Sequence, residues 1–173
     1  MRRWAPVAWA LLVLAAAPAR GEVTQADLQL AARALSFMEK PLTGTVRLGV
    51  VYIPGDDQSL RDADAVVRVL GASLKAGSLV FKPAAVSIDQ ATSAPVDAFF
   101  LPDSLGSRAR KILAATERKH VPCITLDIAQ VRNGTCVLGV QVVPKVQIYV
   151  SRSAAASSGI SFVAVFRMMV TEF

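Results

Sequence analysis

The order of apolar segments predicts an α/β fold, a three-layer sandwich in which a largely parallel sheet of about six strands carries helices on both faces. Several continuous apolar runs are rich in β-branched residues, as is typical of strands buried on both faces of a parallel sheet. Segments with helical spacing of apolar residues alternate with these runs. Two runs close together around Pro144 predict an antiparallel edge.

The first elements are a helix and a strand. Thr24 and Asp27 resemble a capping box, and Pro41 closes the helix that follows them. The run TVRLGVVYI, residues 45–53, is apolar and β-branched and therefore predicts a strand. The turn-forming residues 54–57 end this strand.

A second helix and two strands come next. Ser59 is the expected N-cap of the helix. Residues 79–86 and 96–101 predict strands, and the connection between them is polar and contains a proline. The apolar face of the helix consists of Ala63, Val66, Val67, Leu70 and Leu74.

The alternation continues with a third helix and a fourth strand. Residues 104–120 predict a basic amphipathic helix, and residues 123–126 predict the strand. Asp127 then caps a single helical turn, which Asn133 and Gly134 end.

The last elements are two strands and two helices. Residues 135–142 and 146–150 predict the strands. A short alanine-rich helix ends at Gly159, because glycine readily adopts the left-handed conformation that follows a helix. Ser161 begins a final helix that is apolar on most sides.

Residues 1–21 have the features of a signal peptide. Arg2 and Arg3 precede an apolar run over residues 9–17, and small residues stand at the −3 and −1 positions of a cleavage site before Glu22. The apolar run is shorter than the roughly 20 residues that cross a bilayer. We therefore expect a periplasmic protein with one domain over residues 22–173; the alternative is an uncleaved N-terminal anchor.

The charge of the exported chain does not indicate nucleic-acid binding. The leader holds three of the 19 basic residues and none of the 13 acidic ones, so residues 22–173 carry a net charge of +3. Both tryptophans, Trp4 and Trp9, also lie in the leader. Nucleic-acid binding calls for a clustered basic face, usually with stacking aromatic residues.

Motifs of common active sites are absent from the sequence. It contains no dinucleotide-binding glycine motif, no phosphate-binding loop and no nucleophile elbow. The single histidine, His120, follows a basic helix end, where a cation interacts favourably with the helix dipole. One histidine and two distant cysteines do not make a tetrahedral zinc set without carboxylates. We therefore expect no catalytic, cofactor or metal site, and no enzyme.

Four charged residues near predicted strand ends raise a second hypothesis. Asp56 and Asp57 follow the first strand, Asp103 follows the third, and Lys145 stands beside Pro144. The receiver domains of response regulators use acids and a lysine at comparable positions. Export, a short second connection and the place of Lys145 before a strand favour turn-forming aspartates instead.

Five basic residues crowd the predicted third helix. A solvated helix face accounts for them, and the alternative is a patch that faces anionic lipid headgroups or an acidic partner. They are Arg108, Arg110, Lys111, Arg118 and Lys119.

The two cysteines predict a disulfide. Cys123 opens one predicted strand and Cys136 lies early in the next, so pairing of adjacent strands brings them within bridging distance. Their separation is too long for a C-x-x-C redox motif. In an oxidising compartment two nearby thiols normally oxidise. Two separately buried thiols are the alternative.

The C-terminal segment LDIAQVRNGTCVLGVQVVPKVQIYVSRSAAASSGISFVAVFRMMVTEF resembles the YfiR-like family of periplasmic proteins. A glycine-led strand, a strand ending in a polar residue, an alanine-bearing turn and a small-Gly-hydrophobic-Ser step match in order, over residues 134–140, 146–151, 154–155 and 158–161. Residues 37–41 stand where the family has a Phe…Trp-Pro step, but Lys40 replaces the tryptophan.

The resemblance implies a small periplasmic α/β regulator, often a homodimer, with no catalytic residues. The best-known member restrains an inner-membrane diguanylate cyclase, and relatives accompany sensor kinases. We therefore expect a binding protein that acts in cyclic-di-GMP or kinase signalling through the periplasmic domain of a membrane protein. The alternative is a one-lobe small-molecule binder that resembles an ABC-transporter substrate-binding protein.

The final predicted helix is the expected partner-binding surface. It carries more apolar side chains than a helix with one buried face requires, and methionine suits adaptable contacts. Its alternative role is a helix covered on both sides by its own domain. The residues are Phe162, Val165, Phe166, Met168, Met169 and Val170.

Overall fold

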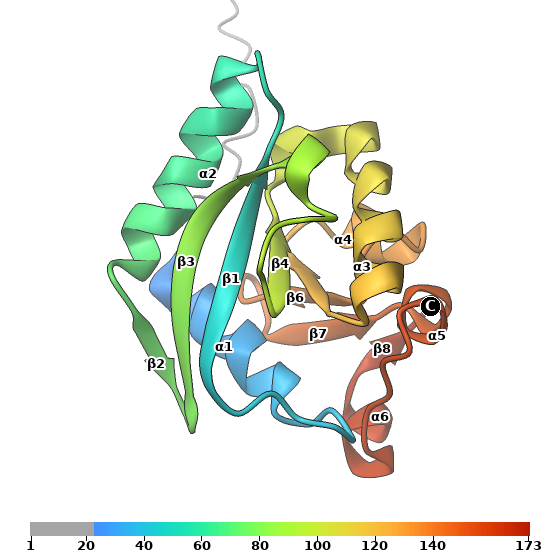
Figure 1. The fold of residues 1–173 in the computed structure, drawn as a ribbon. Coiled ribbons are helices and arrows are strands. Elements are labelled where there is room, and N and C mark those ends of the chain that lie inside the picture. Colours follow the sequence, from blue (N-terminus) through green and yellow to red (C-terminus); the bar gives the residue numbers. More distant parts are fainter. Residues whose placement is uncertain (1–22) are drawn as a thin grey trace, which may run out of the picture.

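The computed structural model describes residues 23–173 of the chain. The predicted signal peptide, residues 1–21, and its cleavage point before Glu22 lie outside the described residues. Figure 1 shows the described chain as one twisted sheet with helices packed around it. The predicted α/β class is therefore confirmed.

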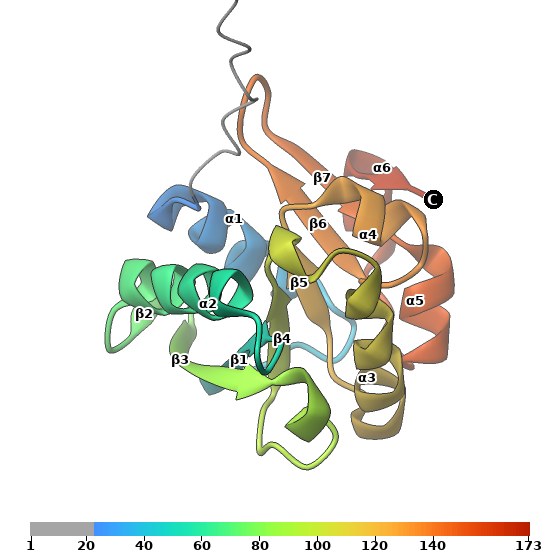
Figure 2. The same ribbon diagram turned by 90° about the horizontal axis from the view of Figure 1, so that it is seen from above.

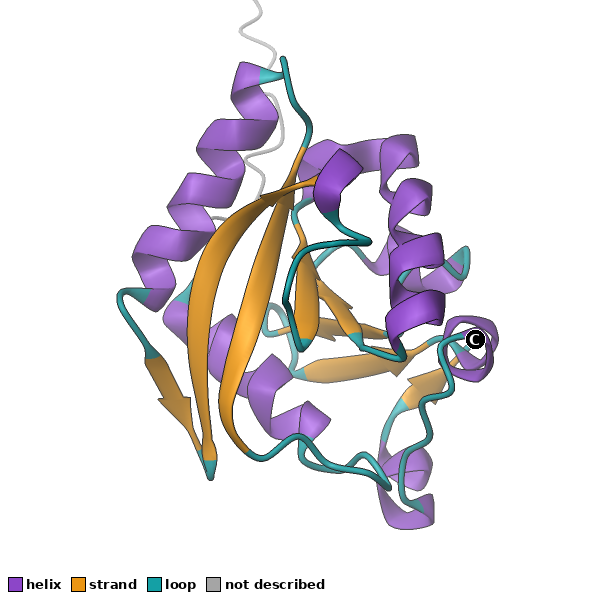
Figure 3. Cartoon of the chain, in the orientation of Figure 1, coloured by secondary structure: helices purple, strands orange, loops and turns teal. Residues whose placement is uncertain are grey.

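The sheet of residues 23–173 has eight strands in the order β2-β3-β1-β4-β5-β6-β7-β8. The five strands from β3 to β6 in this order are parallel, β2 and β7 are antiparallel to their inner neighbours, and β8 is parallel to β7 (Figure 3). The strands are β1 Gly44–Tyr52, β2 Leu74–Ala76, β3 Leu79–Ser87, β4 Ala98–Leu101, β5 Cys123–Thr125, β6 Leu138–Gln141, β7 Gln147–Val150 and β8 Thr171–Glu172.

The central strand β1 has β3 on one side and β4 on the other. The chain goes from β1 to β3 first and then crosses back to β4, so the direction of strand order reverses between β1 and β4. Such a reversal is a topological switch point, and open α/β sheets bind ligands beside it, at the carboxyl ends of the strands.

Helices cover both faces of the sheet. In Figure 2, α1 and α2 lie on one side of the strands, and α3 and α4 lie on the other. The α-helices are α1 Gln25–Leu35, α2 Asp57–Leu70, α3 Leu113–Lys119, α4 Ile128–Arg132, α5 Arg152–Ser157 and α6 Ala164–Met169, and two 3-10 helices span η1 Ile88–Gln90 and η2 Asp103–Ile112.

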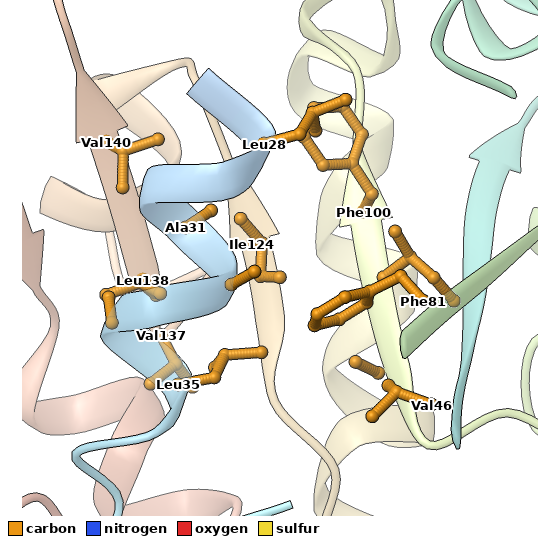
Figure 4. Packing of buried hydrophobic residues seen from close by; sticks show 14 of the residues in the cluster. Leu28, Ala31, Leu35, Val46, Phe81, Phe100, Ile124, Val137, Leu138 and Val140 are labelled. Carbon is orange, nitrogen blue, oxygen red and sulfur yellow. The ribbon is translucent and has the colours of Figure 1, made fainter. Parts of the chain in front are cut away.

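Each face of the sheet has its own core. The larger cluster fills the space beneath α1 and α2, and Figure 4 shows Leu28 and Leu35 of α1 turned toward Phe100 and Ile124 of the sheet. The smaller cluster lies under η2 and α3 and includes Phe99. Because β4 alternates its side chains between the two faces, consecutive phenylalanines serve two different cores.

Helix capping follows the sequence at α1 and differs at α2. The capping box of Thr24 and Asp27 is present in both directions. At α2, Asp56 rather than Ser59 is the N-cap, and its carboxylate accepts a hydrogen bond from the Ser59 N–H at 3.0 Å. Ser59 is buried, and its hydroxyl accepts from the Ile53 N–H at 3.1 Å. The prediction of Ser59 as the cap was therefore wrong.

The predicted helix over residues 104–120 is interrupted. Residues Asp103–Ile112 form the 3-10 segment η2, which is kinked at Gly106, where φ is 49°. The regular helix α3 begins only at Leu113. The left-handed backbone at the glycine interrupts the continuous helix that the amphipathic pattern predicts.

The predicted final helix is shorter than expected. Phe162 forms an isolated antiparallel bridge with Met38, and the Val163 N–H donates to the Phe37 carbonyl at 2.9 Å, so the chain enters α6 in an extended conformation. After Met169 the chain becomes extended again and forms β8 beside β7. Pairing with distant backbone thus replaces helical hydrogen bonds at both ends.

Candidate functional site

The carboxyl ends of β1, β4 and β5 place three loops at one edge of the sheet. The loop after β1 leads into α2 at Asp57, Pro102 and Asp103 follow β4, and Leu126 follows β5. Because these strands are parallel, the three loops emerge side by side. This edge contains the switch point between β1 and β4.

A cavity of about 480 Å³ opens at this edge, between α2 and the sheet. Its volume falls within the range of small-molecule sites, about 300–1,000 Å³. The apolar lining consists of Val23, Ala65, Val66, Val69, Phe100, Pro102 and Leu126, and the polar lining consists of Gln58, Asp62, Arg68 and Asp103. We call it the switch-point cavity.

A chain of hydrogen bonds orients the Asp62 carboxylate. Arg61 donates to Gln58 Oε1 at 2.8 Å, and Gln58 Nε2 donates to Asp62 Oδ1 at 2.7 Å. Gln58 and Asp62 are four residues apart and therefore share one face of α2. No residue of the described chain donates a hydrogen bond to the other oxygen, Asp62 Oδ2.

Asp56, one of the acids that suggested a receiver domain, has a structural role. Asp56 caps α2 and forms an ion pair with Arg108 at 2.6 Å, which links the loops on the two sides of the switch point. Hydrogen bonds from the Ser59 N–H and the Arg108 guanidinium lower the pKa of Asp56. Lys145 is exposed in the loop between β6 and β7. Within residues 23–173, no three His, Cys, Asp or Glu side chains group as metal ligands would.

His120 lies at a helix end, as the sequence predicts. It is the C-cap of α3 and has a left-handed backbone, with φ 55° and ψ 43°. Its Nδ1 lies 3.2 Å from the Ser158 carbonyl oxygen, so the ring links α3 to the turn after α5. His120 therefore holds the end of α3 against the turn after α5.

Three of the five basic residues around α3 bind their own chain. Arg108 pairs with Asp56, Lys111 Nζ lies 3.8 Å from the Asp89 carboxylate, and Lys119 donates to the Ala94 carbonyl at 2.7 Å. Arg110 and Arg118 are exposed. Most of the predicted basic face therefore has an intramolecular explanation.

The structure pairs Cys123 with Cys136. Their Cα atoms are 5.3 Å apart, within the usual range for disulfides, and both side chains are buried. Cys123 lies in β5, and Cys136 lies just before β6, which is the neighbouring strand. The predicted pairing of adjacent strands thus brings the two residues together.

The predicted partner-binding residues fall into two groups. Phe162 and Phe166 are 4% and 1% exposed and belong to the protein's own core, and Val170 is half-buried. Val165, Met168 and Met169 are 61%, 79% and 65% exposed. Sequence reasoning treated the six as one surface because a helical apolar pattern does not reveal which side is covered.

Two further exposed residues extend this group. Phe37 stacks on Phe166 with 4.9 Å between ring centroids, and Val163 is the N-cap of α6. The sequence does not signal Phe37, because it reaches α6 only through the distant pairing of residues 37 and 163. We define the α6 surface as Phe37, Val163, Val165, Met168 and Met169.

No helix in residues 23–173 combines the length and the hydropathy needed to cross a bilayer.

The structure is similar to several solved proteins at low sequence identity. No protein-family model matches the sequence, and no curated protein matches it either.

The solved chains include three bacterial proteins. An ABC domain in complex with L-Trp from Streptococcus pneumoniae has a TM-score of 0.58, 13% identity and 84% coverage of this chain. A conserved domain protein from Vibrio cholerae has a TM-score of 0.56 with 13% identity and 86% coverage. A ligand-free, open substrate-binding protein with adhesive properties from Clostridium difficile has a TM-score of 0.52 with 10% identity and 87% coverage.

The matched region covers 60%, 59% and 60% of those three chains, so this protein spans a little over half of their length. At 10–13% identity the likeness concerns the fold. The chain therefore shares its α/β fold with these three solved chains.

Proposed function

We propose that this protein is a periplasmic regulatory binding protein, which restrains a diguanylate cyclase or sensor kinase of the inner membrane by binding its periplasmic domain. The observation that carries the proposal is the α6 surface, where five apolar side chains are exposed around one short helix. Contiguous apolar surface of this kind marks sites of protein contact. The YfiR-like resemblance of the C-terminal segment supports the same class of function.

The α6 surface has the composition of a small interface core with a polar rim. Burying a valine or methionine side chain contributes about 1.5–3 kcal/mol, so a few such residues supply the centre of a contact. Two polar contacts flank them: an ion pair between Arg167 and Glu172 at 2.7 Å, and a hydrogen bond that the Ser161 hydroxyl donates to the Glu39 carboxylate at 2.7 Å. Such a rim remains hydrated while the apolar centre is covered.

Deletion of the gene tests the proposal in the cell. We expect the deletion to raise cyclic-di-GMP, measured by mass spectrometry of cell extracts, because restraint of the cyclase is lost. The wild-type protein should recover a membrane signalling protein on affinity purification from crosslinked cells. Unchanged cyclic-di-GMP together with no membrane signalling protein in the eluate would show that the regulatory proposal is wrong.

Introducing a charged residue into the α6 surface tests whether this surface contacts the partner. We expect Met168→Glu to abolish recovery of the partner and to leave the melting temperature unchanged, because Met168 is 79% exposed. Val143→Glu is the matched control, since Val143 is 78% exposed but lies in the loop at the other end of β7. Equal recovery of the partner by both variants contradicts the placement of the surface. If the wild type and Val143→Glu are homodimers and Met168→Glu is a monomer, the α6 surface serves self-association.

The switch-point cavity favours a second candidate, a one-lobe small-molecule binder. The cavity has the volume of a ligand site, and two of the similar solved chains are described as bound to L-Trp or as a substrate-binding protein. Native mass spectrometry of protein isolated from the periplasm tests this candidate. We expect a bound small molecule that is released by denaturation; a mass equal to that of the polypeptide alone in fresh extracts counts against it.

A further inference from the structure

The switch-point cavity combines an apolar floor with a fixed acceptor. Among the apolar lining residues, Phe100, Val66 and Pro102 are buried, and we call these three the floor. Val69 and Leu126 also line the cavity and are only partly buried. A ligand that fills the cavity therefore presents an apolar group to its floor, because polar atoms placed there would lose water without gaining a partner.

The acceptor is the Asp62 carboxylate. Asp62 is half-buried on the cavity wall, and the hydrogen bond from Gln58 holds one of its oxygens in place. The other oxygen receives no hydrogen bond within residues 23–173. A carboxylate with one oriented, unused oxygen beside an apolar wall is complementary to a donor, and a charged donor forms the stronger hydrogen bond.

The charges around the cavity favour a cation over an anion. The half-buried Asp62 lines it, whereas the basic lining residue, Arg68, is exposed to solvent. Arg68 follows Asp62 by six residues, which places it about 9 Å further along the helix axis. Solvent screens the exposed guanidinium more than the half-buried carboxylate. An anionic ligand would meet repulsion from the Asp62 carboxylate.

We infer that the switch-point cavity binds a small organic molecule that carries an apolar group and a protonated amine, and that Asp62 holds the amine. The inference rests on the second candidate function proposed above, to which it adds the ligand class, the site and the anchoring residue. It is independent of the α6 surface, because no residue of that surface lines the cavity.

A matched pair of probes tests the ligand class. Phenethylamine and phenethyl alcohol have the same apolar group and nearly the same size, but only the amine is charged at pH 7. The measurement is NMR titration of the mature protein, followed at the methyl groups of Val66, Val69 and Leu126. We expect saturable shifts at these methyls and a dissociation constant at least tenfold lower for the amine than for the alcohol.

Substitutions in α2 test whether Asp62 binds the amine. Asp62→Asn keeps the side-chain size but removes the charge, and we expect it to abolish the tenfold preference for the amine. Asp64→Asn is the control, because Asp64 is on the same helix but does not line the cavity, and it should keep the preference. Ala65→Leu fills the cavity and should weaken both probes. Melting temperatures close to wild type show that each variant is folded.

The outcomes distinguish a failure of this inference from a failure of the second candidate function, the small-molecule binder. Equal affinity for the two probes, or a preference that persists in Asp62→Asn, overturns the amine assignment and leaves a small-molecule binder in place. Absence of saturable shifts at the cavity methyls with both probes overturns the site. In that case, a small molecule retained in native mass spectrometry would still support the second candidate function, with its ligand bound elsewhere.

Discussion

Asp97, the residue before β4, forms a bidentate ion pair with Arg47 of β1. Arg47 donates from Nε to Asp97 Oδ2 at 2.9 Å and from its second terminal nitrogen to Oδ1 at 2.7 Å. The Arg47 backbone N–H also donates to Oδ2, at 2.8 Å. The side-chain hydrogen bonds from Arg47 lower the pKa of Asp97 against the opposing effect of burial. The pair joins β1 to the chain entering β4.

This pair predicts a pH-dependent loss of stability. The pKa of Asp97 in the folded state lies below its value in the unfolded chain, about 3.9. Its stabilisation is therefore complete above that value and is lost as the pH falls through the folded-state pKa. In thermal melts, we expect the deficit of Asp97→Asn relative to wild type to shrink from pH 6 to pH 3.

Asp64→Asn is the control for this experiment, because the Asp64 side chain makes no hydrogen bond or ion pair with another described residue. Its melting temperature should stay close to that of wild type across the range. A deficit of Asp97→Asn that is constant from pH 6 to pH 3 would mean that the Asp97 charge contributes nothing to stability.

The cysteine pair also gives a prediction at the scale of single residues. The two cysteines are 13 positions apart, and closing a loop of this length stabilises a fold by about 3 kcal/mol in the chain-entropy model. We expect Cys136→Ser to lower the melting temperature by roughly 6–12 °C, measured by circular dichroism. Reductant should lower the wild-type value similarly and leave the variant unchanged. Wild type that melts at the same temperature with and without reductant would contradict a structural disulfide.

At the scale of elements, the start of α2 depends on one carboxylate with two roles. Asp56 caps the helix through the Ser59 N–H and binds Arg108 of η2. A cap satisfies a backbone donor that otherwise has no intrahelical partner, whereas an exposed ion pair gains little after hydration and screening. The cap is therefore the more important role.

Three variants separate the two roles. Asp56→Ala loses both, and we expect it to lower the melting temperature by roughly 2–4 °C. Asp56→Asn retains a good N-cap and loses the charge, so it should match Arg108→Ala, with a smaller change. Thermal melts of the three proteins measure this. If Asp56→Asn is as unstable as Asp56→Ala, the ion pair and not the cap stabilises this element.

For the whole molecule, the two candidate binding regions are well separated. The switch-point cavity lies beside α2, and the α6 surface lies beyond β7, on the far side of the molecule in both Figure 1 and Figure 2. Substitutions in one region should therefore leave binding at the other unchanged. This separation makes the two candidate functions independently testable.

Export is the second property of the whole molecule that we predict. We expect protein recovered from a periplasmic extract to have an intact mass that begins at Glu22, because the residues before it have the features of a cleavage site. Intact-mass spectrometry of the extract measures this directly. A mass that retains residues 1–21 would mean that the leader stays attached, and the chain would then be anchored.

The local pattern of residues determined most of the fold. The continuous apolar run of residues 45–53 located β1 almost to the residue, since a strand buried on both faces needs such a run. The prediction of a strand over residues 79–86 likewise matches β3. Capping residues marked the starts of α1 and α4, because a cap acts on backbone within its own turn. The cysteines, one in β5 and one just before the neighbouring strand β6, were predicted to approach each other from their short spacing. All of these signals act over a few residues or between adjacent elements.

The tertiary structure alone decided the strands β2 and β8, of three and two residues, which are too short to show a period. It also decided which apolar residues near the C-terminus are covered. Phe162 is buried because its segment pairs with residues 37–39, and the hydrogen bond between Ser161 and Glu39 joins positions 122 residues apart. The switch-point cavity likewise combines α2 with the ends of β4 and β5. Contacts at such separations leave no periodic signal in one sequence, because they depend on how whole elements pack.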